Sequence, residues 1–528
     1  MSPRPDIEPF LVTAEQMQQI EARIFAAGMP VAALMEKVAG RLSQWFAQRH
    51  GKARGKKIGV LAGPGHNGGD ALVMARELHY LGYELCVYQP FAKCKPLTAQ
   101  HAQYAKSLGI AFVESVQGLI ACDAIIDGGF GFGLTREITH PLAGDIEAIN
   151  QQPIPVFSID LPSGIHTDSG QVLGVAIRAK HTACLGLWKR GLMQASALAY
   201  LGKCELIDFD IPLADIAAVL GTTPAVQRLT RQVALAHLPL NRAPSTHKYQ
   251  VGHLLLIAGS KQYAGAALLA GQGAIASGVG MLTLAVPESI RLAILAALPG
   301  ALLMGCPETA DGAIAQLPSR IDLDQYDAIA LGPGLTPSVP DLLLQVLNAD
   351  CPVLLDADGL NLLAQQHPLQ ILPSRSAPTI LTPHTGEFKR LFPDIHHQYV
   401  QDLAGESALA AAQASGAIIL LKGPRSAIAT PNSLWFNPDS TPALARGGSG
   451  DVLTGLMGGL GAIAASSQPT PHPLAQTCSK TLADSVLSAV WWHSQAALYA
   501  SHHRSVLGVD PLHLAQALNP ALQHVLNT

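Results

Sequence analysis

Short apolar segments, each followed by a glycine-rich loop and then by a helical pattern, recur along the whole chain and constrain its fold most strongly. The predicted strands of the first half are 57–62, 85–88, 124–126, 156–159 and 206–209. Those of the second half are 254–258, 281–286, 328–331, 353–355, 380–381 and 418–421, with a hairpin over 427–430 and 434–437. This alternation predicts the α/β class, with helices covering doubly wound parallel sheets.

The length of the chain indicates that these strands and helices form two domains. A chain of 528 residues is too long for one ordinary core. The stretch from about 214 to 246 is rich in Ala and Leu and carries few turn motifs, so we expect it to be a connector. We place the boundary near residue 225, which gives domains of residues 1–225 and 226–528.

Charge and cysteine usage exclude several classes of protein. The net charge is −4, which favours neither nucleic acid nor a membrane surface as a partner. The uncharged run 263–286 holds five glycines and is expected to be a buried helix, a turn and a strand, not a membrane span. The eight cysteines form no CxxC pair, and the N-terminus lacks a signal pattern. We therefore expect a cytoplasmic protein with reduced thiols and no structural zinc.

Three polar loops follow strands of the first half, over residues 63–70, 127–133 and 160–164. Each alone is also what an ordinary turn would use. Because the carboxyl ends of parallel strands share one edge of a sheet, the three loops are expected to converge on a ligand. Asp160, at a strand end, is the best candidate for a base. Asn67, Asp127 and Ser163 offer oxygen ligands of low total charge, which suit a weakly bound monovalent cation.

The second half carries a corresponding set of loops, over 332–335, 356–361, 382–387, 422–426 and 447–451. The last, Gly-Gly-Ser-Gly-Asp, opens a helix predicted to begin at Asp451. Unpaired N–H groups and the helix dipole make such a turn a natural anion site. Asp451 then has two interpretations: a base for a hydroxyl that attacks a phosphate, or a helix N-cap.

Other polar residues of these loops also keep two interpretations each. The side chains of Lys422 and Arg425 are consistent with contacts to nucleotide phosphates or with a solvated loop end. His384 is either a binding residue or part of a turn that opens a helix. Asp356 and Asp358 serve either packing or magnesium.

Four motifs of the first half together resemble the NAD(P)HX epimerase family: 63–70, 127–133, 160–164 and Leu-Trp-Lys-Arg-Gly-Leu at 187–192. The resemblance implies a Rossmann-like fold that interconverts the R and S epimers of hydrated NAD(P)H. It implies a potassium ion on Asn67, Asp127 and Ser163. The implied substrate contacts are His66, Asn67, Gly68, Gly69, Asp70, Gly131, Phe132, Gly133 and Asp160. The family usually has Asn where this chain has His66.

The motifs of the second half occur in the order seen in the ADP/ATP-dependent NAD(P)H-hydrate dehydratases, of the ribokinase-like superfamily. The resemblance implies Asp451 as catalytic base, Mg²⁺ with ADP or ATP, and substrate contacts at Gly334 and His384. The implied nucleotide contacts are Lys422, Gly423, Pro424, Arg425, Ser426, Gly448, Ser449 and Gly450. This chain departs from the usual pattern at Thr385, at 424–426 and at Ser449.

The two resemblances cover nearly the whole chain in the order of bifunctional enzymes that repair NADHX and NADPHX. They imply an epimerase joined to a dehydratase that releases AMP or ADP and phosphate, and we expect a homo-oligomer. Two alternatives remain open. A small-molecule alcohol kinase with a fused ligand-binding domain would release a stable phosphorylated product instead of free phosphate. A non-catalytic binding protein would need neither Asp160 nor Asp451.

Overall fold

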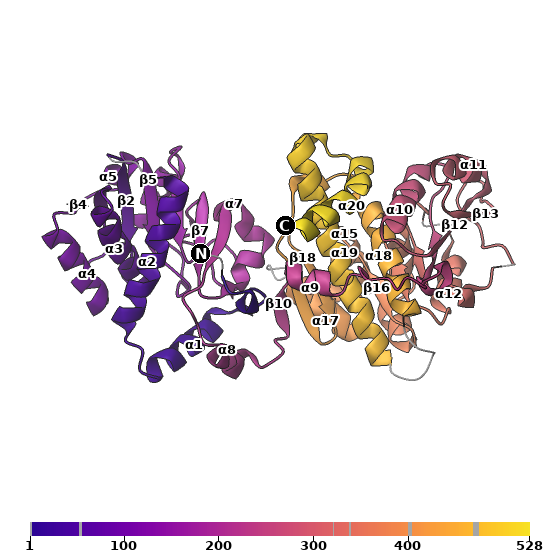
Figure 1. Cartoon of the computed structure of the whole chain (residues 1–528), viewed down its shortest axis with the longest axis horizontal. Helices are drawn as coiled ribbons and strands as arrows, with labels where there is room; N and C mark the ends of the chain where they lie inside the picture. The colour runs from indigo at the N-terminus through magenta and orange to yellow at the C-terminus, as the bar shows by residue number, and fades with distance from the viewer. Residues whose placement is uncertain (1–2, 52–54, 320, 337–338, 400–403, 468–474) are drawn as a thin grey trace. The chain divides into compact units, whose positions relative to one another are not determined.

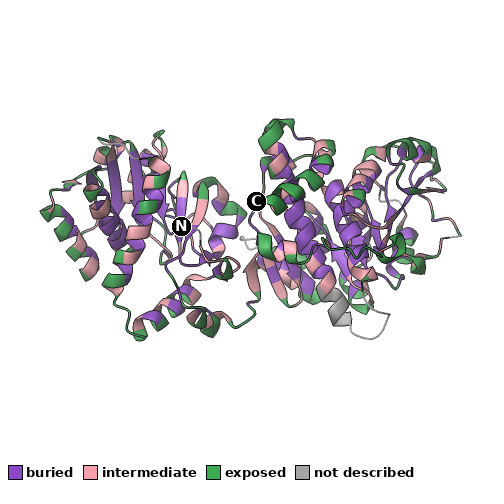
Figure 2. Cartoon of the chain, viewed as in Figure 1, coloured by how far each residue is buried: buried purple, intermediate pink, exposed green. Residues whose placement is uncertain are grey.

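The computed structural model describes residues 3–51, 55–319, 321–336, 339–399, 404–467 and 475–528. The chain divides into two compact units, residues 1–226 and 227–528 (Figure 1). Both units are α/β with a largely parallel sheet, which confirms the predicted fold class. Figure 2 shows the strands of both sheets as mostly buried, while the outer faces of many helices are exposed.

A seven-stranded parallel sheet forms the centre of the first unit, in the order β4-β3-β2-β5-β6-β7-β9. Its strands are β2 (Lys57–Ala62), β3 (Glu84–Tyr88), β4 (Ala111–Val113), β5 (Ala124–Gly128), β6 (Val156–Ile159), β7 (His181–Leu185) and β9 (Lys203–Ile207). A separate parallel pair joins β1 (Leu11–Val12) to β8 (Trp188–Lys189). The helices are α1 (Ala14–Ala26), α2 (Val31–His50), α3 (His66–Tyr80), α4 (Pro96–Ser107), α5 (Gln117–Ile120), α6 (Leu142–Asn150), α7 (Leu198–Leu201) and α8 (Leu213–Leu220).

The order of the strands places the candidate site of the first unit. From β2 the chain proceeds outward through β3 and β4, and then returns to β5 on the other side of β2. The carboxyl ends of β2 and β5 are therefore neighbours at the point where the strand order reverses, with Leu61 paired to Asp127. Open α/β sheets bind ligands at such a point. Helix α3 begins there and packs against both strands.

The second unit is built on a ten-stranded sheet, in the order β10-β19-β18-β17-β16-β15-β14-β11-β12-β13. Its strands are β10 (Val226–Arg228), β11 (His253–Ile257), β12 (Met281–Pro287), β13 (Leu302–Cys306), β14 (Ala328–Leu331), β15 (Val353–Leu355), β16 (Thr379–Leu381), β17 (Ile418–Leu421), β18 (Ser426–Thr430) and β19 (Ser433–Asn437). The strands from β11 to β17 are parallel, and β18 and β19 form the predicted antiparallel hairpin.

The helices of the second unit include α9 (Arg231–Ala236), α10 (Ala264–Ala276), α11 (Glu288–Ala297), α12 (Pro340–Leu347), α13 (Asp358–Ala364), α14 (Pro368–Ile371), α15 (Thr385–Leu391), α16 (Pro393–Gln398), α17 (Ala404–Ser415), α18 (Ser449–Ser466), α19 (Ala475–Arg504) and α20 (Pro511–Asn527). Helix α18 packs against β11 and β14 and is covered by α10 and α19. This packing fixes the N-terminus of α18 at the edge where β14 to β17 end.

Glycines permit the close approach of α10 and α18. A Cβ on Gly273 would lie 2.1 Å from the carbonyl oxygen of Val452, and one on Gly455 would lie 1.7 Å from that of Ala270. Real Cβ atoms do not approach backbone this closely, so a side chain at either position would push the helices apart. The glycine content of 263–286 thus serves helix packing, and the predicted helix, turn and strand are α10 and β12. Among the described residues, no helix is long and apolar enough to cross a membrane.

Several predicted boundaries are wrong. Helix α3 begins at His66, not near Gly69, and α18 begins at Ser449, not at Asp451. The last predicted strand of the first half, 206–209, is β9 at 203–207, and β4, β7, β10 and β13 have no predicted counterpart. The expected connector contains α8, β10 and α9. Glycine-rich sequence favours a loop by propensity, but packing overrides it where the helix lies against the sheet.

Candidate active sites

A cavity of about 670 Å³ lies at the carboxyl edge of the first sheet. Seven of the predicted site residues line it: His66, Asn67, Asp70, Gly131, Phe132, Gly133 and Asp160. Gly68 and Gly69 do not. A Cβ on Gly68 would lie 2.0 Å from the carbonyl oxygen of Gly63, and one on Gly69 would lie 2.7 Å from Met35 Cε. These two glycines let the first turn of α3 pack closely against its neighbours.

Asp160 is held in the cavity by hydrogen bonds to both of its carboxylate oxygens. Oδ2 accepts from the backbone N–H of Phe132 at 3.0 Å, and Oδ1 accepts from that of Leu185 at 3.3 Å. The Lys189 ammonium donates to Oδ1 at 2.5 Å. The backbone of Asp160 is left-handed, with φ of +67°, a conformation that costs free energy in a non-glycine residue.

Lys189 is a site residue that the sequence analysis did not assign, although it lies in the quoted 187–192 motif. Its side chain is buried, lines the cavity and forms an ion pair with Asp160. Burial lowers the pKa of the Lys189 ammonium, but the charge and hydrogen bond of Asp160, together with Cys184 and Glu21, outweigh burial, and the net pKa is raised. The pair therefore consists of an ammonium and a carboxylate, both almost without solvent.

The predicted cation ligands Asp127 and Ser163 are in direct contact. The Ser163 hydroxyl donates to Asp127 Oδ1 at 2.5 Å, and the Ser163 N–H donates to Oδ2 at 2.8 Å. Ser158 and the N–H of Gly129 donate to the same carboxylate. Burial raises the pKa of Asp127, and no Lys, Arg or His of the described residues forms an ion pair with it. The Asp127 carboxyl is thus buried with hydrogen bonds but without a cationic side chain among the described residues.

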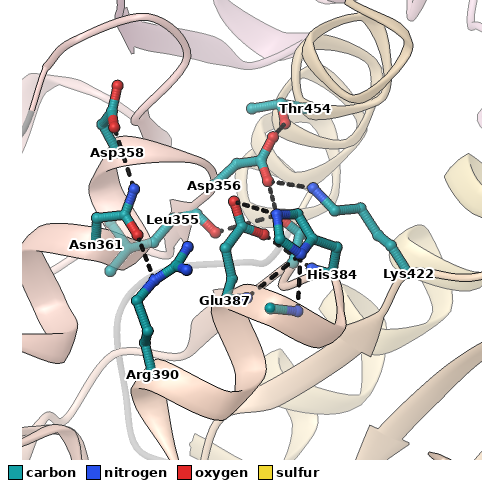
Figure 3. Close-up of polar contacts among 11 residues, drawn as sticks. Leu355, Asp356, Asp358, Asn361, His384, Glu387, Arg390, Lys422 and Thr454 are labelled. Atoms are coloured by element: carbon teal, nitrogen blue, oxygen red, sulfur yellow. Dashed lines mark hydrogen bonds and ion pairs between the residues drawn. The ribbon is translucent and has the colours of Figure 1, made fainter. Parts of the chain in front are cut away.

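Four side chains converge on the end of β15 in the second unit, as Figure 3 shows for three of them. The buried Asp356 carboxylate accepts from the Lys422 ammonium at 2.6 Å, from Thr382 Oγ1 at 2.7 Å and from Thr454 Oγ1 at 2.6 Å. Burial raises the pKa of Asp356, but Lys422 and the two hydroxyl groups outweigh it, and the net pKa is lowered. Asp356 joins β15, β16, β17 and α18 at one point.

Asp356 and Asp358 both make structural contacts at this edge of the sheet, as the packing interpretation expects. The Asp356 carboxylate is already paired with a cation and hydrogen-bonded on both oxygens. Asp358 accepts from the N–H of Thr336 at 3.0 Å and from Asn361 at 3.2 Å. Within the described part of the chain, no cluster of three His, Cys, Asp or Glu side chains has the arrangement of a metal site. Both carboxylates hold the fold of this edge together.

Asp451 differs from these carboxylates because no described residue donates a hydrogen bond to its side chain. The N-cap of α18 is Gly448, so Asp451 is the third residue of the helix, which contradicts the N-cap interpretation. Burial has the largest effect on the pKa of Asp451 and, with the charge of Asp356, raises it to about 6. The charge of Lys422 acts in the opposite direction and lowers this pKa. The result is a free carboxylate, poised near neutral pH, at a helix N-terminus.

The glycine-rich turn before Asp451 is held by hydrogen bonds to residues outside the Gly-Gly-Ser-Gly-Asp motif. The hydroxyl of Ser449 lies 2.8 Å from the carbonyl oxygen of Leu444, and the N–H of Ser449 donates to Arg446. The buried ring of His493, on α19, donates from Nε2 to the carbonyl oxygen of Ser449 at 3.0 Å. Burial lowers the pKa of His493 to about 4, so the ring is neutral. His493 was missed by the sequence analysis because its partner is distant in the chain.

The other predicted residues of the second unit are distributed along the same edge. His384 is the N-cap of α15: its Nδ1 accepts from the N–H groups of Gly386 and Glu387, as the turn interpretation expects. A Cβ on Gly450 would lie 3.6 Å from Lys422 Nζ, so the turn and the lysine are neighbours. Gly423 and Pro424 are exposed, Arg425 and Ser426 are half-buried, and Gly334 has a left-handed backbone.

Comparison with known proteins places both units in one family. Residues 254–520 match the family model described as NAD(P)H-hydrate dehydratase, and residues 31–191 match the YjeF-related protein N-terminus. The chain is 53% identical over 517 residues to the bifunctional NAD(P)H-hydrate repair enzyme Nnr of Synechocystis sp., which covers 98% of this chain and 95% of the relative. The enzyme of the same name from Thermosynechococcus vestitus is 50% identical over 519 residues, covering 98% of each.

A solved structure is similar to part of this chain. The ADP/ATP-dependent NAD(P)H-hydrate dehydratase of Bacillus subtilis, co-crystallised with ATP and Mg²⁺, is 34% identical, covers 56% of this chain and 98% of its own, and gives a TM-score of 0.47. The full-length relatives define the class, a fused two-domain metabolite repair enzyme. The chain belongs to the family of bifunctional NAD(P)H-hydrate repair enzymes, with epimerase and dehydratase activities.

The first prediction concerns the ion pair of Lys422. Replacing Lys422 by Met leaves the buried Asp356 carboxylate without its cation, and we expect a loss of about 3 kcal/mol in the stability of the second unit. Urea unfolding measures this loss. Lys389→Met, an exposed lysine on α15, is the matched control and is expected to change stability by less than about 0.5 kcal/mol. An equal effect of the two changes would contradict the role assigned to the pair.

Proposed function

We propose that the second unit dehydrates the S epimer of NADHX or NADPHX with ADP or ATP, and that Asp451 is its catalytic base. The observation that supports this most strongly is the unpaired Asp451 carboxyl at the N-terminus of α18. A base must be ionised near neutral pH and free to accept a proton. Two other carboxylates of this edge are buried but occupied: Asp356 by Lys422 and two hydroxyl groups, and Glu387 by the N–H of His384 at 2.8 Å.

The proposed reaction begins at the hydroxyl group of the hydrated nicotinamide ring. Asp451 takes the hydroxyl proton while the oxygen attacks the terminal phosphorus of the nucleotide, and AMP or ADP leaves. The N–H groups of Gly450 and Asp451, in the first turn of α18, face the charge that develops on the phosphoryl oxygens. The ring nitrogen then expels phosphate as its lone pair enters the ring, and loss of a neighbouring proton restores NADH or NADPH.

Mg²⁺ fits this site only together with the nucleotide. The carboxylates of Asp356 and Asp358 are already hydrogen-bonded, and Asp451 has to stay free as the base, which leaves the phosphate oxygens as the main ligands. Mg²⁺ commonly binds through substrate phosphates and one or two carboxylates, and it supplies charge neutralisation at the phosphates. Lys422 to Ser426, Gly448 and Ser449 are proposed as the surrounding nucleotide contacts. Gly334 and His384 are proposed as contacts to the hydrated substrate.

The second prediction tests Asp451. Asp451→Asn keeps the shape of the side chain but removes the base, and nucleotide-dependent NADH formation is expected to fall about 10²–10⁴-fold. Because the pKa of Asp451 is about 6, the wild-type rate is expected to fall as the pH drops below about 6. Absorbance of NADH and release of free phosphate measure both effects. A normal rate in the Asn variant would leave Asp451 without a catalytic role, and a stable phosphorylated product would indicate a kinase.

We propose that the cavity of the first unit is the epimerase site. Asp160 is proposed as a proton-transfer group, and His66, Asn67, Asp70 and 131–133 as substrate contacts, because they line one cavity. Gly68 and Gly69 shape the turn that carries them. The residues also fit potassium in charge: the Asp127 carboxylate is buried without a cationic partner among the described residues, and Ser163 and Asn67 add neutral oxygens. The cation would offset this buried charge.

The third prediction concerns that cation. Asp127→Ala removes the charge that potassium would neutralise, so epimerisation and its response to potassium are expected to weaken together. Dehydration of the pure S epimer is expected to continue at the wild-type rate, since Asp127 belongs to the other unit. Rates measured in potassium-containing and potassium-free buffer provide the test. If the wild-type epimerase is equally active in both buffers, no potassium site operates there.

A further inference from the structure

Two carboxyl groups of the epimerase cavity have no proposed part in proton transfer so far: Asp70 is proposed only as a substrate contact, and Glu21 has no proposed role. Glu21 projects from α1 and Asp70 from α3, and both line the same cavity as Asp160 and Lys189. Asp70 is only 9% exposed, and Glu21 is half-buried. No described residue donates a hydrogen bond to either carboxyl group. A buried carboxyl group that lacks a partner and faces a cavity is available to a ligand.

The chemistry of epimerisation requires two proton-transfer groups. Hydration of the double bond next to the ring nitrogen places the hydroxyl on the carbon attached to that nitrogen, because its lone pair stabilises the cation formed there. To invert this carbon, the carbon–oxygen bond breaks with protonation of the hydroxyl, and the nitrogen lone pair forms a C=N⁺ bond. Water then adds from the other face, returns the lone pair to nitrogen and loses a proton. One group donates a proton while another accepts one.

The surroundings of the carboxyl groups differ as expected for one proton donor and one proton acceptor. Asp160 is ion-paired with Lys189 and accepts two backbone hydrogen bonds, which suits a carboxylate that accepts a proton. Burial, followed by the charge of Asp160, raises the pKa of Glu21 to about 7, with Lys189 and Lys95 opposing. Burial raises the pKa of Asp70 well above its usual range. Groups of contrasting protonation in one site are a common acid–base arrangement.

We propose that Glu21 is a further catalytic residue of the epimerase, exchanging a proton with the oxygen on one face of the reacting carbon while Asp160 exchanges a proton with the oxygen on the other. In one direction Glu21 donates and Asp160 accepts, and in the reverse direction the roles are exchanged. Asp70, the proposed substrate contact on α3, lines the same cavity. This inference rests on the assignment of the cavity as the epimerase site.

The pKa of Glu21 depends on the titratable groups that surround it. Those that face the same cavity from the elements packed around it are His66 and Asp70 on α3, Lys95 before α4, Asp160 after β6 and Lys189 on β8. The acid form of Glu21 is present below its pKa and is lost as the pH rises through about 7. Epimerisation that uses Glu21 as the acid is therefore expected to slow above this pH.

The test uses the full-length chain, one purified epimer and no nucleotide, so that only epimerisation is measured. The variant Glu21→Gln has nearly the same shape but cannot donate or accept the proton. Its kcat is expected to fall about 10²–10⁴-fold with a KM within about threefold of wild type, and the decline above neutral pH is expected to disappear. Glu15→Gln is the matched control, because it removes the same charge from an exposed position of α1.

A second variant keeps the proposal testable if Glu21→Gln is poorly folded. Glu21→Asp retains an acid, so it is expected to keep the decline above neutral pH and to lose less activity than Glu21→Gln. A wild-type rate in Glu21→Gln, a decline above neutral pH that persists in it, or an equal loss in Glu15→Gln would overturn the role of Glu21. Absence of epimerisation in the wild-type protein would instead overturn the proposed function of the cavity.

Discussion

The ion pair between Asp356 and Lys422 is the interaction on which the dehydratase site depends. Asp356 follows β15, Lys422 follows β17, and the hydroxyl groups of Thr382 and Thr454 bring β16 and α18 to the same carboxylate. A buried charge is stable only with such partners, so each element is fixed relative to the others. One turn before Thr454, Asp451 then lies in the field of both charges, and its pKa is set by this arrangement.

The first unit contains a corresponding buried ion pair, formed by residues of a different sequence motif. The buried Lys189 neutralises Asp160 at the carboxyl end of β6, as Lys422 neutralises Asp356. In each unit one carboxylate is ion-paired and another carboxyl group stays free: Asp451 in the second, Glu21 in the first. The paired carboxylate gives the site its geometry and charge, and the free group has a pKa near neutral pH, which suits proton transfer.

The sequence could predict the sheets and the loops that converge, because strands buried on both faces leave continuous apolar runs. It could not predict that α3 begins at His66 or α18 at Ser449, since glycines there indicate a loop unless the close packing is known. Lys422 was predicted as a nucleotide contact, but its partner Asp356 is distant in sequence. Glu21 could not be predicted either, because a helical sequence pattern does not show which of its polar residues faces a cavity.

The central claim is that two separate sites, one in each unit, act in sequence on hydrated NAD(P)H. Mixing two full-length variants, Asp451→Asn and Asp160→Asn, with a mixture of both epimers and ADP or ATP tests it directly through the absorbance of restored NADH. Alone, the first is expected to restore almost none, and the second only the S epimer plus what epimerises spontaneously. Together they are expected to convert the whole mixture. A combined reaction that stops where Asp160→Asn stops would contradict the claim.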